Sequence, residues 1–226
     1  MSEVSTQDQA VTKEKEPLFS AKNKRLIIDP LNDTNPITVQ VLGVCSALAV
    51  TVQLKNAVVM SLSVLAVLVL GNLLVSLMRN IIPSRIRIIV QLVVVAALVI
   101  LVDQVLKAYV YDVSKQLSVF VGLIITNCII MGRLEAFALA NKPGVSILDG
   151  IGNGLGYGLI LCVVAFVREF FGSGKVWGYP LFEKLGLYDM GYMNNNFMIL
   201  PPMALIIVGI YIWIQRSKNT KLVEAN

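Results

Sequence analysis

Six long runs without a charged residue constrain the fold of this chain more than any other feature. A membrane-spanning helix needs about 20 mostly apolar residues, and each run approaches that length once its flanking residues are counted. One run of about 15 apolar residues would also suit a buried helix of a soluble protein, but six runs joined by short basic linkers do not. The sequence therefore predicts an all-α integral membrane protein with six transmembrane helices, in the runs Thr34–Leu54, Val58–Met78, Ile88–Val102, Gln116–Gly132, Gly150–Val167 and Gly191–Gln215.

The composition and the distribution of charge agree with this class. The 226 residues are 56% hydrophobic and 15% charged, whereas soluble domains are about 25% charged. A net charge of +5 would suit nucleic acid, but in membrane proteins Lys and Arg gather in cytoplasmic loops. When the loops are assigned to alternate sides, thirteen of the 19 basic residues lie on the side of the N-terminal tail. Both termini are therefore predicted to be cytoplasmic.

The chain is predicted to form one transmembrane domain with two tails. Residues 1–33 are polar and lack the apolar core and cleavage site of a signal peptide, so we expect a solvated cytoplasmic tail. The six-helix domain covers 34–216, with repeat halves at 34–110 and 114–216, and residues 217–226 form a short C-terminal tail.

An internal repeat relates the two halves of the domain. Each half has three spans, an odd number, so the second half is predicted to be inverted relative to the first. The segment Val39–Cys45 is similar to Val119–Cys128, which places one cysteine in each of helices 1 and 4. Small or polar residues beside both cysteines are typical of interrupted helices, which often carry the binding site in proteins with inverted repeats. The alternative is a chance similarity between two apolar segments.

The cysteines are the candidate ligands of a metal. The chain has no histidine, which excludes bis-histidine haem sites and most zinc sites, so a bound metal would be held by thiolates or carboxylates. Thiolates suit iron–sulfur clusters, which usually take four cysteines. Cys45 and Cys128 alone cannot complete such a site, and the metal hypothesis requires a second pair from another chain. The alternative is that both are small hydrophobic packing residues, which is how we interpret Cys162.

Two glycine-rich segments look like nucleotide-binding motifs but do not match the residue patterns of those motifs. The run Asp149–Gly158 has no register that satisfies G-x-G-x-x-G, and no strand precedes it. Its glycines recur every four residues, which is typical of closely packed membrane helices. The segment Gly172–Lys175 lacks the first glycine and the final Ser or Thr of a P-loop.

The charged residues at the ends of the runs are expected to be solvated at the membrane interfaces. These residues are Asp103, Asp112, Glu135, Asp149 and Glu169, and Arg168 is likewise expected to lie at an interface. Asp103 with Gln104, and Arg133 with Glu135, are possible ion-binding or helix-contact groups. Pro201 and Pro202 are expected to start or kink the last span.

Four segments resemble a known family: the small membrane proteins that include the D subunit of the Na⁺-translocating NADH:quinone oxidoreductase. The similarity runs from Asp33 to Arg216, and the two cysteine motifs are specific to these proteins and their relatives. The N-terminal tail is longer than in the family, and Leu134 stands where the family has alanine. The four segments are Leu42–Thr51, Ser118–Phe137, Asp149–Gly158 and Arg168–Gly174.

The resemblance implies a protein that is not active alone but belongs to a six-subunit NADH:ubiquinone reductase of the bacterial inner membrane, which exports Na⁺. Its implied partners are the homologous E subunit, in the opposite orientation, and the A, B, C and F subunits. By resemblance, Cys45 and Cys128 bind iron of a [2Fe-2S] cluster shared with the E subunit, which relays electrons across the bilayer. The Ser-Gly-Ala-Thr motif for flavin attachment is missing, so no flavin is expected on this chain.

Three other functions remain open from the sequence. Relatives of the family serve the Rnf complex, which couples ferredoxin and NAD to ion transport, although Ser46, Ala47 and the glycine-rich run favour the quinone reductase. A secondary transporter would also use inverted repeats with a site near the midplane. A scaffold protein of the complex would need its cysteines only for packing.

Overall fold

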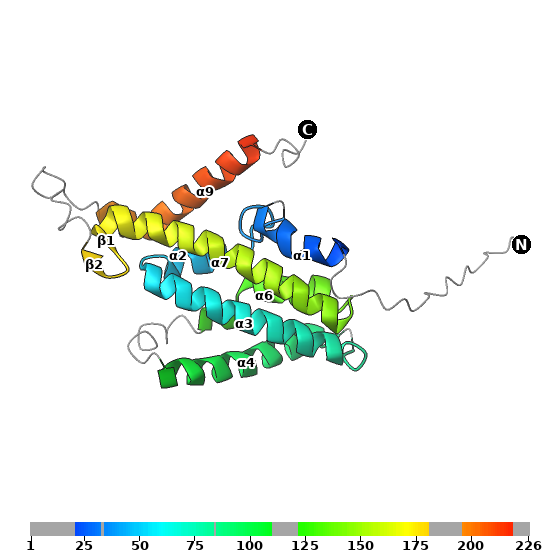
Figure 1. The fold of residues 1–226 in the computed structure, drawn as a ribbon. Helices are drawn as coiled ribbons and strands as arrows, with labels where there is room; N and C mark the ends of the chain where they lie inside the picture. The colour runs from blue at the N-terminus through cyan, green and yellow to red at the C-terminus, as the bar shows by residue number, and fades with distance from the viewer. Residues whose placement is uncertain (1–20, 33, 84, 110–121, 181–195, 219–226) are drawn as a thin grey trace, which may run out of the picture.

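The computed structural model describes residues 21–32, 34–83, 85–109, 122–180 and 196–218, which form a helical bundle with one short hairpin (Figure 1). The helices are α1 (Ala21–Asn32), α2 (Val44–Val50), α3 (Leu54–Met78), α4 (Arg87–Tyr109), α6 (Cys128–Arg133), the π-helix η1 (Leu134–Ala138), α7 (Pro143–Ser173), the 3-10 helix η2 (Asn196–Ile199) and α9 (Pro201–Lys218). The hairpin pairs β1 (Lys175–Val176) with β2 (Tyr179–Pro180) in antiparallel register.

Among the described residues, three helices are long and apolar enough to cross a membrane, and they coincide with three of the six predicted spans. They are α3, α4 and α7, with 25, 23 and 31 residues. At 1.5 Å per residue, even the shortest covers about 35 Å, slightly more than the apolar core of a bilayer. The first predicted run contains only the seven-residue helix α2, and the fourth and sixth runs lie partly outside the described residues. Helix α9 begins at Pro201, as expected, because proline suits the first turn of a helix.

Helices α3 and α7 form the centre of the bundle and run side by side (Figure 1). Helix α4 lies against α3, and α1 lies against α7. Helix α9 leans away from the C-terminal end of α7. The buried core follows the contact between α3 and α7 and includes Met60, Val64, Leu68 and Leu161.

The glycines of α7 allow its close contacts on two sides, which confirms the prediction that they pack helices. On one side, a Cβ atom at Gly154 would lie 2.4 Å from Cδ1 of Leu65 in α3. On the other side, a Cβ atom at Gly152 would lie 2.4 Å from the carbonyl oxygen of Leu26, and one at Gly156 would lie 2.4 Å from that of Pro30. The obstructing atoms of α1 belong to the backbone, so α1 contacts α7 almost backbone to backbone, whereas on the other side the nearest atom of α3 is the end of the Leu65 side chain and its Cα atom would lie at 3.3 Å.

The packing of α1 differs from the solvated tail that its composition suggests. Part of the polar N-terminal segment forms this helix, which packs against α7 through Leu26, Ile27 and Pro30. The glycines at 152 and 156 make the contact possible because they let the backbone of a weakly apolar helix come close to α7. The remaining residues of the predicted tail, 1–20 and 33, lie outside the described part of the chain.

Two charged residues near the end of α7 are buried, so the expectation that they are solvated is wrong. Arg168 is 1% exposed and Glu169 is 7% exposed. Nη1 of Arg168 donates to Oγ1 of Thr51, at 2.6 Å, and to the carbonyl oxygen of Leu48 near the end of α2. Oε2 of Glu169 accepts a hydrogen bond from the backbone N–H of Leu54, the first residue of α3, at 2.6 Å. A cation thus sits at the C-terminus of α2 and an anion at the N-terminus of α3, where each is favoured by the helix dipole.

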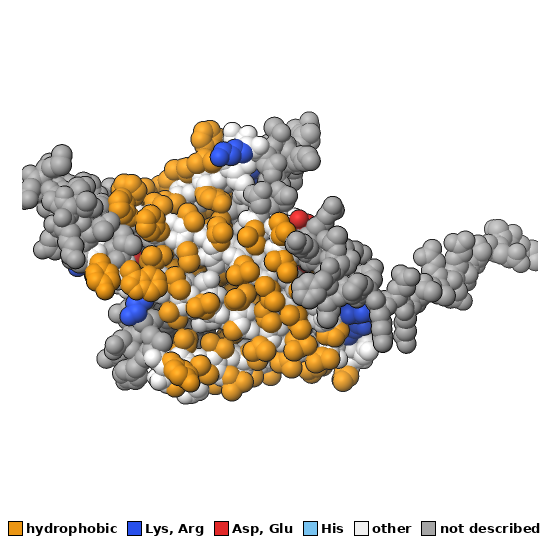
Figure 2. Space-filling view, viewed as in Figure 1, with side chains coloured by type: hydrophobic (Ala, Val, Ile, Leu, Met, Phe, Trp, Pro, Cys, Tyr) orange, Lys and Arg blue, Asp and Glu red, His pale blue; other side chains and the backbone are white. Residues whose placement is uncertain are grey.

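Apolar side chains cover most of the face seen in Figure 2, and the basic side chains lie at its margins. Many large apolar residues on α3, α4 and α9 are exposed, among them Leu62, Ile89, Leu101 and Trp213. An apolar surface of this extent suits contact with lipid or with other membrane proteins.

Candidate metal centre

The two cysteines predicted to share a site lie next to each other. The Sγ atoms of Cys45 and Cys128 are 4.0 Å apart, although the residues are 83 positions apart in the sequence. Cys45 is the second residue of α2, and Cys128 is the first residue of α6. Both side chains are exposed at the surface of this chain, so a group bound between them would be open to a partner.

Non-helical backbone precedes each cysteine: residues 34–43 before α2, and Thr126 and Asn127 before Cys128. Gly43 adopts a left-handed conformation with φ of 83° and forms the N-cap of α2. Residues 122–125 are helical, the helix ends at Thr126, and Asn127 then caps α6 through its side-chain oxygen, which accepts a hydrogen bond from the N–H of Ile129. Such breaks are what the sequence predicts for interrupted helices at a site within the membrane.

A small buried network joins the two cysteine segments. The hydroxyl of Ser46 donates to the carbonyl oxygen of Gly43 at 2.7 Å and lies 2.6 Å from the hydroxyl of Tyr157. Nδ2 of Asn127 lies 3.4 Å from Oγ of Ser46 and 3.5 Å from the Tyr157 hydroxyl. Ser46 follows Cys45, and Asn127 precedes Cys128, so the network connects the immediate neighbours of both thiols.

The separation of the thiols fits ligation of a single metal ion. Two thiolates on one tetrahedral ion, with metal–sulfur bonds of about 2.3 Å as at zinc, lie about 3.8 Å apart, close to the observed 4.0 Å. Within the described ranges, no group of three or more Cys, Asp or Glu residues is placed to hold a metal. Cys45 and Cys128 can therefore supply two ligands of a site that other chains complete, whereas Cys162 lies in α7, half-buried and outside the pair.

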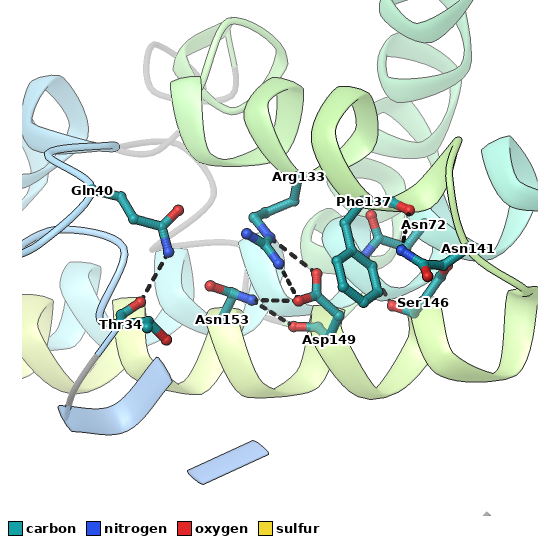
Figure 3. A network of polar contacts seen from close by, with 9 residues as sticks. All are labelled: Thr34, Gln40, Asn72, Arg133, Phe137, Asn141, Ser146, Asp149 and Asn153. Carbon is teal, nitrogen blue, oxygen red and sulfur yellow. Dashed lines mark hydrogen bonds and ion pairs between the residues drawn. The ribbon is translucent and has the colours of Figure 1, made fainter. Parts of the chain in front are cut away.

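The possible ion-binding pair Arg133 and Glu135 makes contacts between helices. Arg133, the last residue of α6, forms an ion pair with Asp149 of α7 (Figure 3). Glu135 forms an ion pair with Arg87 and accepts a hydrogen bond from Gln91, both in α4. Asp149 is 1% exposed, so its predicted solvation is wrong.

Asp103 pairs with Lys107 of its own helix α4, with Oδ2 2.6 Å from Nζ. That contact links it to no second helix. Asp112 lies outside the described residues.

A polar cavity of about 310 Å³ adjoins the ion pair of Arg133 and Asp149. Nδ2 of Asn153 donates to the backbone oxygen and to Oδ1 of Asp149, each at 3.0 Å. Oδ1 of Asn153 is buried and has no hydrogen-bond partner among the described residues; it points away from Asp149, toward Gln40 and Thr34 (Figure 3). The cavity is lined by Leu26, Asp29, Pro30, Thr34, Gln40, Arg133, Asp149 and Asn153.

The sequence did not indicate that Tyr157, Asp149 and Arg168 make buried contacts between distant segments. Tyr157 lies in the glycine-rich run, and its partner Ser46 is 111 positions away, so no local pattern connects them. A signal for Asp149 and Arg168 was present, because a charged residue inside or beside an apolar run must find partners if it is buried.

Comparisons with known proteins agree on one family. Residues 23–212 match the family described as Rnf-Nqr subunit, membrane protein. The chain is 58% identical over 204 residues to the D subunit of the Na(+)-translocating NADH-quinone reductase of Aeromonas hydrophila, with 89% of this chain and 96% of the relative covered. It is 54% identical over 202 residues to the D subunit of Haemophilus ducreyi and 53% identical over 205 residues to that of Serratia proteamaculans; the alignments cover 89% and 91% of this chain, and 97% and 98% of the relatives.

Proposed function

Because the chain belongs to the Rnf-Nqr family of membrane proteins, we propose that it works as a membrane component of a Na⁺-translocating NADH:quinone reductase. The relatives at 53–58% identity all carry that name and match along almost their whole length. Its exposed apolar surface suits a protein surrounded by lipid and by other membrane chains. In this role the chain is part of an oxidoreductase complex and not an enzyme by itself.

Cys45 and Cys128 are proposed as ligands of an iron–sulfur centre within the membrane. The observation that carries this proposal is the 4.0 Å distance between their Sγ atoms, at helix breaks that hold corresponding places in the two halves. The pair would supply two thiolates, and the homologous E subunit the other two, to a [2Fe-2S] cluster. When bound, such a cluster would pass single electrons between carriers on the two sides of the bilayer.

The residues of this chain would hold and shield that centre. Each cysteine lies at the start of a short helix, beside Ser46 or Asn127, and the network of those two side chains with Tyr157 is buried. The apolar core behind α2 and α6, with Ala47, Ile129 and Ile130, is fully buried and keeps water from that side of the thiols.

The six-span arrangement remains a proposal that the helix breaks support. We propose six transmembrane segments in an inverted 3+3 repeat, with both termini in the cytoplasm and the domain in the bacterial inner membrane. Segments 1 and 4 would be the interrupted ones, with a short helix starting at or next to each cysteine. The A, B, C and F subunits would complete the complex.

Helix α6 offers a route by which Na⁺ transport could be coupled to this centre. Cys128 is its first residue and Arg133 its last, and Arg133 pairs with Asp149 at the polar cavity. Arg133 neutralises Asp149 in the ion pair, and the cavity also has the carboxylate of Asp29 and the unpartnered oxygen of Asn153, which are oxygen ligands of the kind that bind hard cations. We propose that Na⁺ passes through this cavity and that movements of α6 link its occupancy to the cysteine pair.

The test uses the purified complex with Cys45→Ala or Cys128→Ala, and with Cys162→Ala as the matched control. Iron per complex and NADH-driven quinone reduction are measured on assembled material. The first two variants are expected to lose iron and to stop reducing quinone, while Cys162→Ala keeps both. If Cys45→Ala and Cys128→Ala assemble with full iron and normal turnover, the cysteines are packing residues and the proposal fails.

A further inference from the structure

Tyr157 contacts both cysteine segments from a third helix. It lies in α7, is 0% exposed, and its hydroxyl reaches Ser46 and Asn127. Helix α7 is held on two sides by the close glycine contacts with α1 and α3, so Tyr157 projects from the best-anchored part of the bundle. The short helices α2 and α6, with seven and six residues, have little rigidity of their own.

The donor and the acceptor of each hydrogen bond in this network can be assigned. The single proton of Ser46 is donated to the carbonyl oxygen of Gly43 at 2.7 Å. The Tyr157 hydroxyl therefore donates its own proton to Oγ of Ser46, at 2.6 Å, and accepts from Nδ2 of Asn127. Oδ1 of Asn127 meanwhile accepts from the N–H of Ile129. One phenol thus links the N-terminal turn of α2 to the N-cap of α6.

The ring of Tyr157 also fixes the break before Cys45. A Cβ atom at Gly43 would lie 2.9 Å from Cε2 of Tyr157, and Gly43 has the left-handed φ of 83° that glycine tolerates best. The ring therefore packs directly on the turn that begins α2, while the hydroxyl holds the residue after Cys45.

We propose that Tyr157 is a positioning residue for the thiol pair: its hydroxyl sets the separation and orientation of Cys45 and Cys128, and through them the properties of the proposed iron centre. The part that concerns iron rests on the proposed function, but the part that concerns the thiols does not. Tyr157 does not touch a ligand itself, because it acts through Ser46 and Asn127.

The test is Tyr157→Phe in the whole complex, which removes the hydroxyl and keeps the ring on Gly43. Tyr211→Phe on α9 is the matched control, because Tyr211 is partly buried and lies outside the network. Low-temperature EPR line shape and midpoint potential of the intramembrane centre are measured on assembled, iron-loaded complex. Tyr157→Phe is expected to keep its iron but to change both readouts, and Tyr211→Phe to change neither. Ser46→Ala removes the acceptor of the Tyr157 hydroxyl and should also change both readouts, and the two effects should be less than additive in the double variant, because both substitutions remove the same hydrogen bond between the two hydroxyls.

A second readout separates this inference from the proposed function. In iron-depleted complex treated with a fixed concentration of an added thiol oxidant, which takes up the two electrons, the rate of disulfide formation between Cys45 and Cys128 reports their relative position directly. Loss of the two hydrogen bonds that the hydroxyl makes with Ser46 and Asn127 is expected to change this rate by about fivefold or more in Tyr157→Phe, whether or not the pair binds iron in the native complex. If disulfide rate, line shape and potential all equal those of wild type, Tyr157 does not position the thiols and the inference is overturned. If Cys45→Ala loses iron but Tyr157→Phe keeps the wild-type disulfide rate, line shape and potential, the proposed function holds and only the inference about Tyr157 fails.

Discussion

The contact between α1 and α7 gives a prediction whose size follows from the structure. In Gly152→Ala, the new Cβ atom would lie 2.4 Å from the carbonyl oxygen of Leu26 and 3.0 Å from Cα of Ile27. Ordinary contact begins near 3.4 Å, so α1 must move by the difference of 3.4 and 2.4, about 1 Å. Both obstructing atoms belong to the backbone, and no change of rotamer can relieve the clash.

Overpacking of this kind costs about 1–3 kcal/mol, and alanine returns about 1 kcal/mol through its higher helix propensity. Residue 152 lies in α7, which stays helical whether or not α1 is attached, so the propensity gain does not offset the clash and the attachment of α1 is weakened by about 1–3 kcal/mol. The matched control is Gly209→Ala in α9, where a Cβ atom meets nothing within 4 Å. Gly209→Ala gains only the higher helix propensity of alanine. The difference in free energy between the two variants therefore measures the cost of the clash.

Limited trypsin digestion of the detergent-solubilised complex measures the attachment of α1. The bond between Arg25 and Leu26 lies within α1, and cleavage there follows the fraction of molecules in which the helix is open. A loss of about 1–3 kcal/mol multiplies that fraction about 5- to 150-fold, so cleavage in Gly152→Ala should be faster by that factor while Gly209→Ala matches wild type. Equal cleavage rates in all three proteins would refute the packing of α1 on α7.

Two further predictions concern buried polar groups. Arg168→Met leaves the hydroxyl of Thr51 and the carbonyl oxygens of Met198 and Ile199 without their donor. Each unsatisfied buried group costs about 1–3 kcal/mol, so the thermal midpoint of the complex should fall clearly in Arg168→Met. The control Arg216→Met on α9 should leave the midpoint unchanged. An unaltered midpoint for Arg168→Met would contradict the role of this residue. Asn153→Leu removes the free oxygen from the polar cavity, so the Na⁺ concentration for half-maximal quinone reduction should rise by about fivefold. An unchanged Na⁺ dependence would remove the cavity from the proposed route.

The sequence predicts the long elements of the fold because their signals are local. The apolar runs gave α3, α4 and α7, and the four-residue spacing of glycines in Asp149–Gly158 correctly indicated close helix packing. The lengths were less accurate. Helix α7 extends from Pro143 to Ser173, beyond the uncharged run, because Asp149, Arg168 and Glu169 find partners within the protein.

The sequence indicated the site only through the similarity between the two segments that contain cysteine. Cys45 and Cys128 lie in two segments of similar sequence, and that similarity alone predicted that they meet; the structure places their Sγ atoms 4.0 Å apart. Tyr157 and the packing of α1 were not predictable in this way, because each depends on contacts between distant segments. A tyrosine in an apolar helix and a polar N-terminal segment have no periodic pattern that would indicate their partners.

The most direct test of the account is low-temperature EPR of the reduced, purified complex, in wild type and in the variants Cys45→Ala and Cys128→Ala. The account predicts that the signal of the intramembrane iron centre is lost in each variant, because a site that takes two thiolates from this chain cannot form with one. The signals of all other centres should remain, which shows that the complex is intact. An unchanged intramembrane signal in either variant would contradict the assignment of that cysteine as an iron ligand.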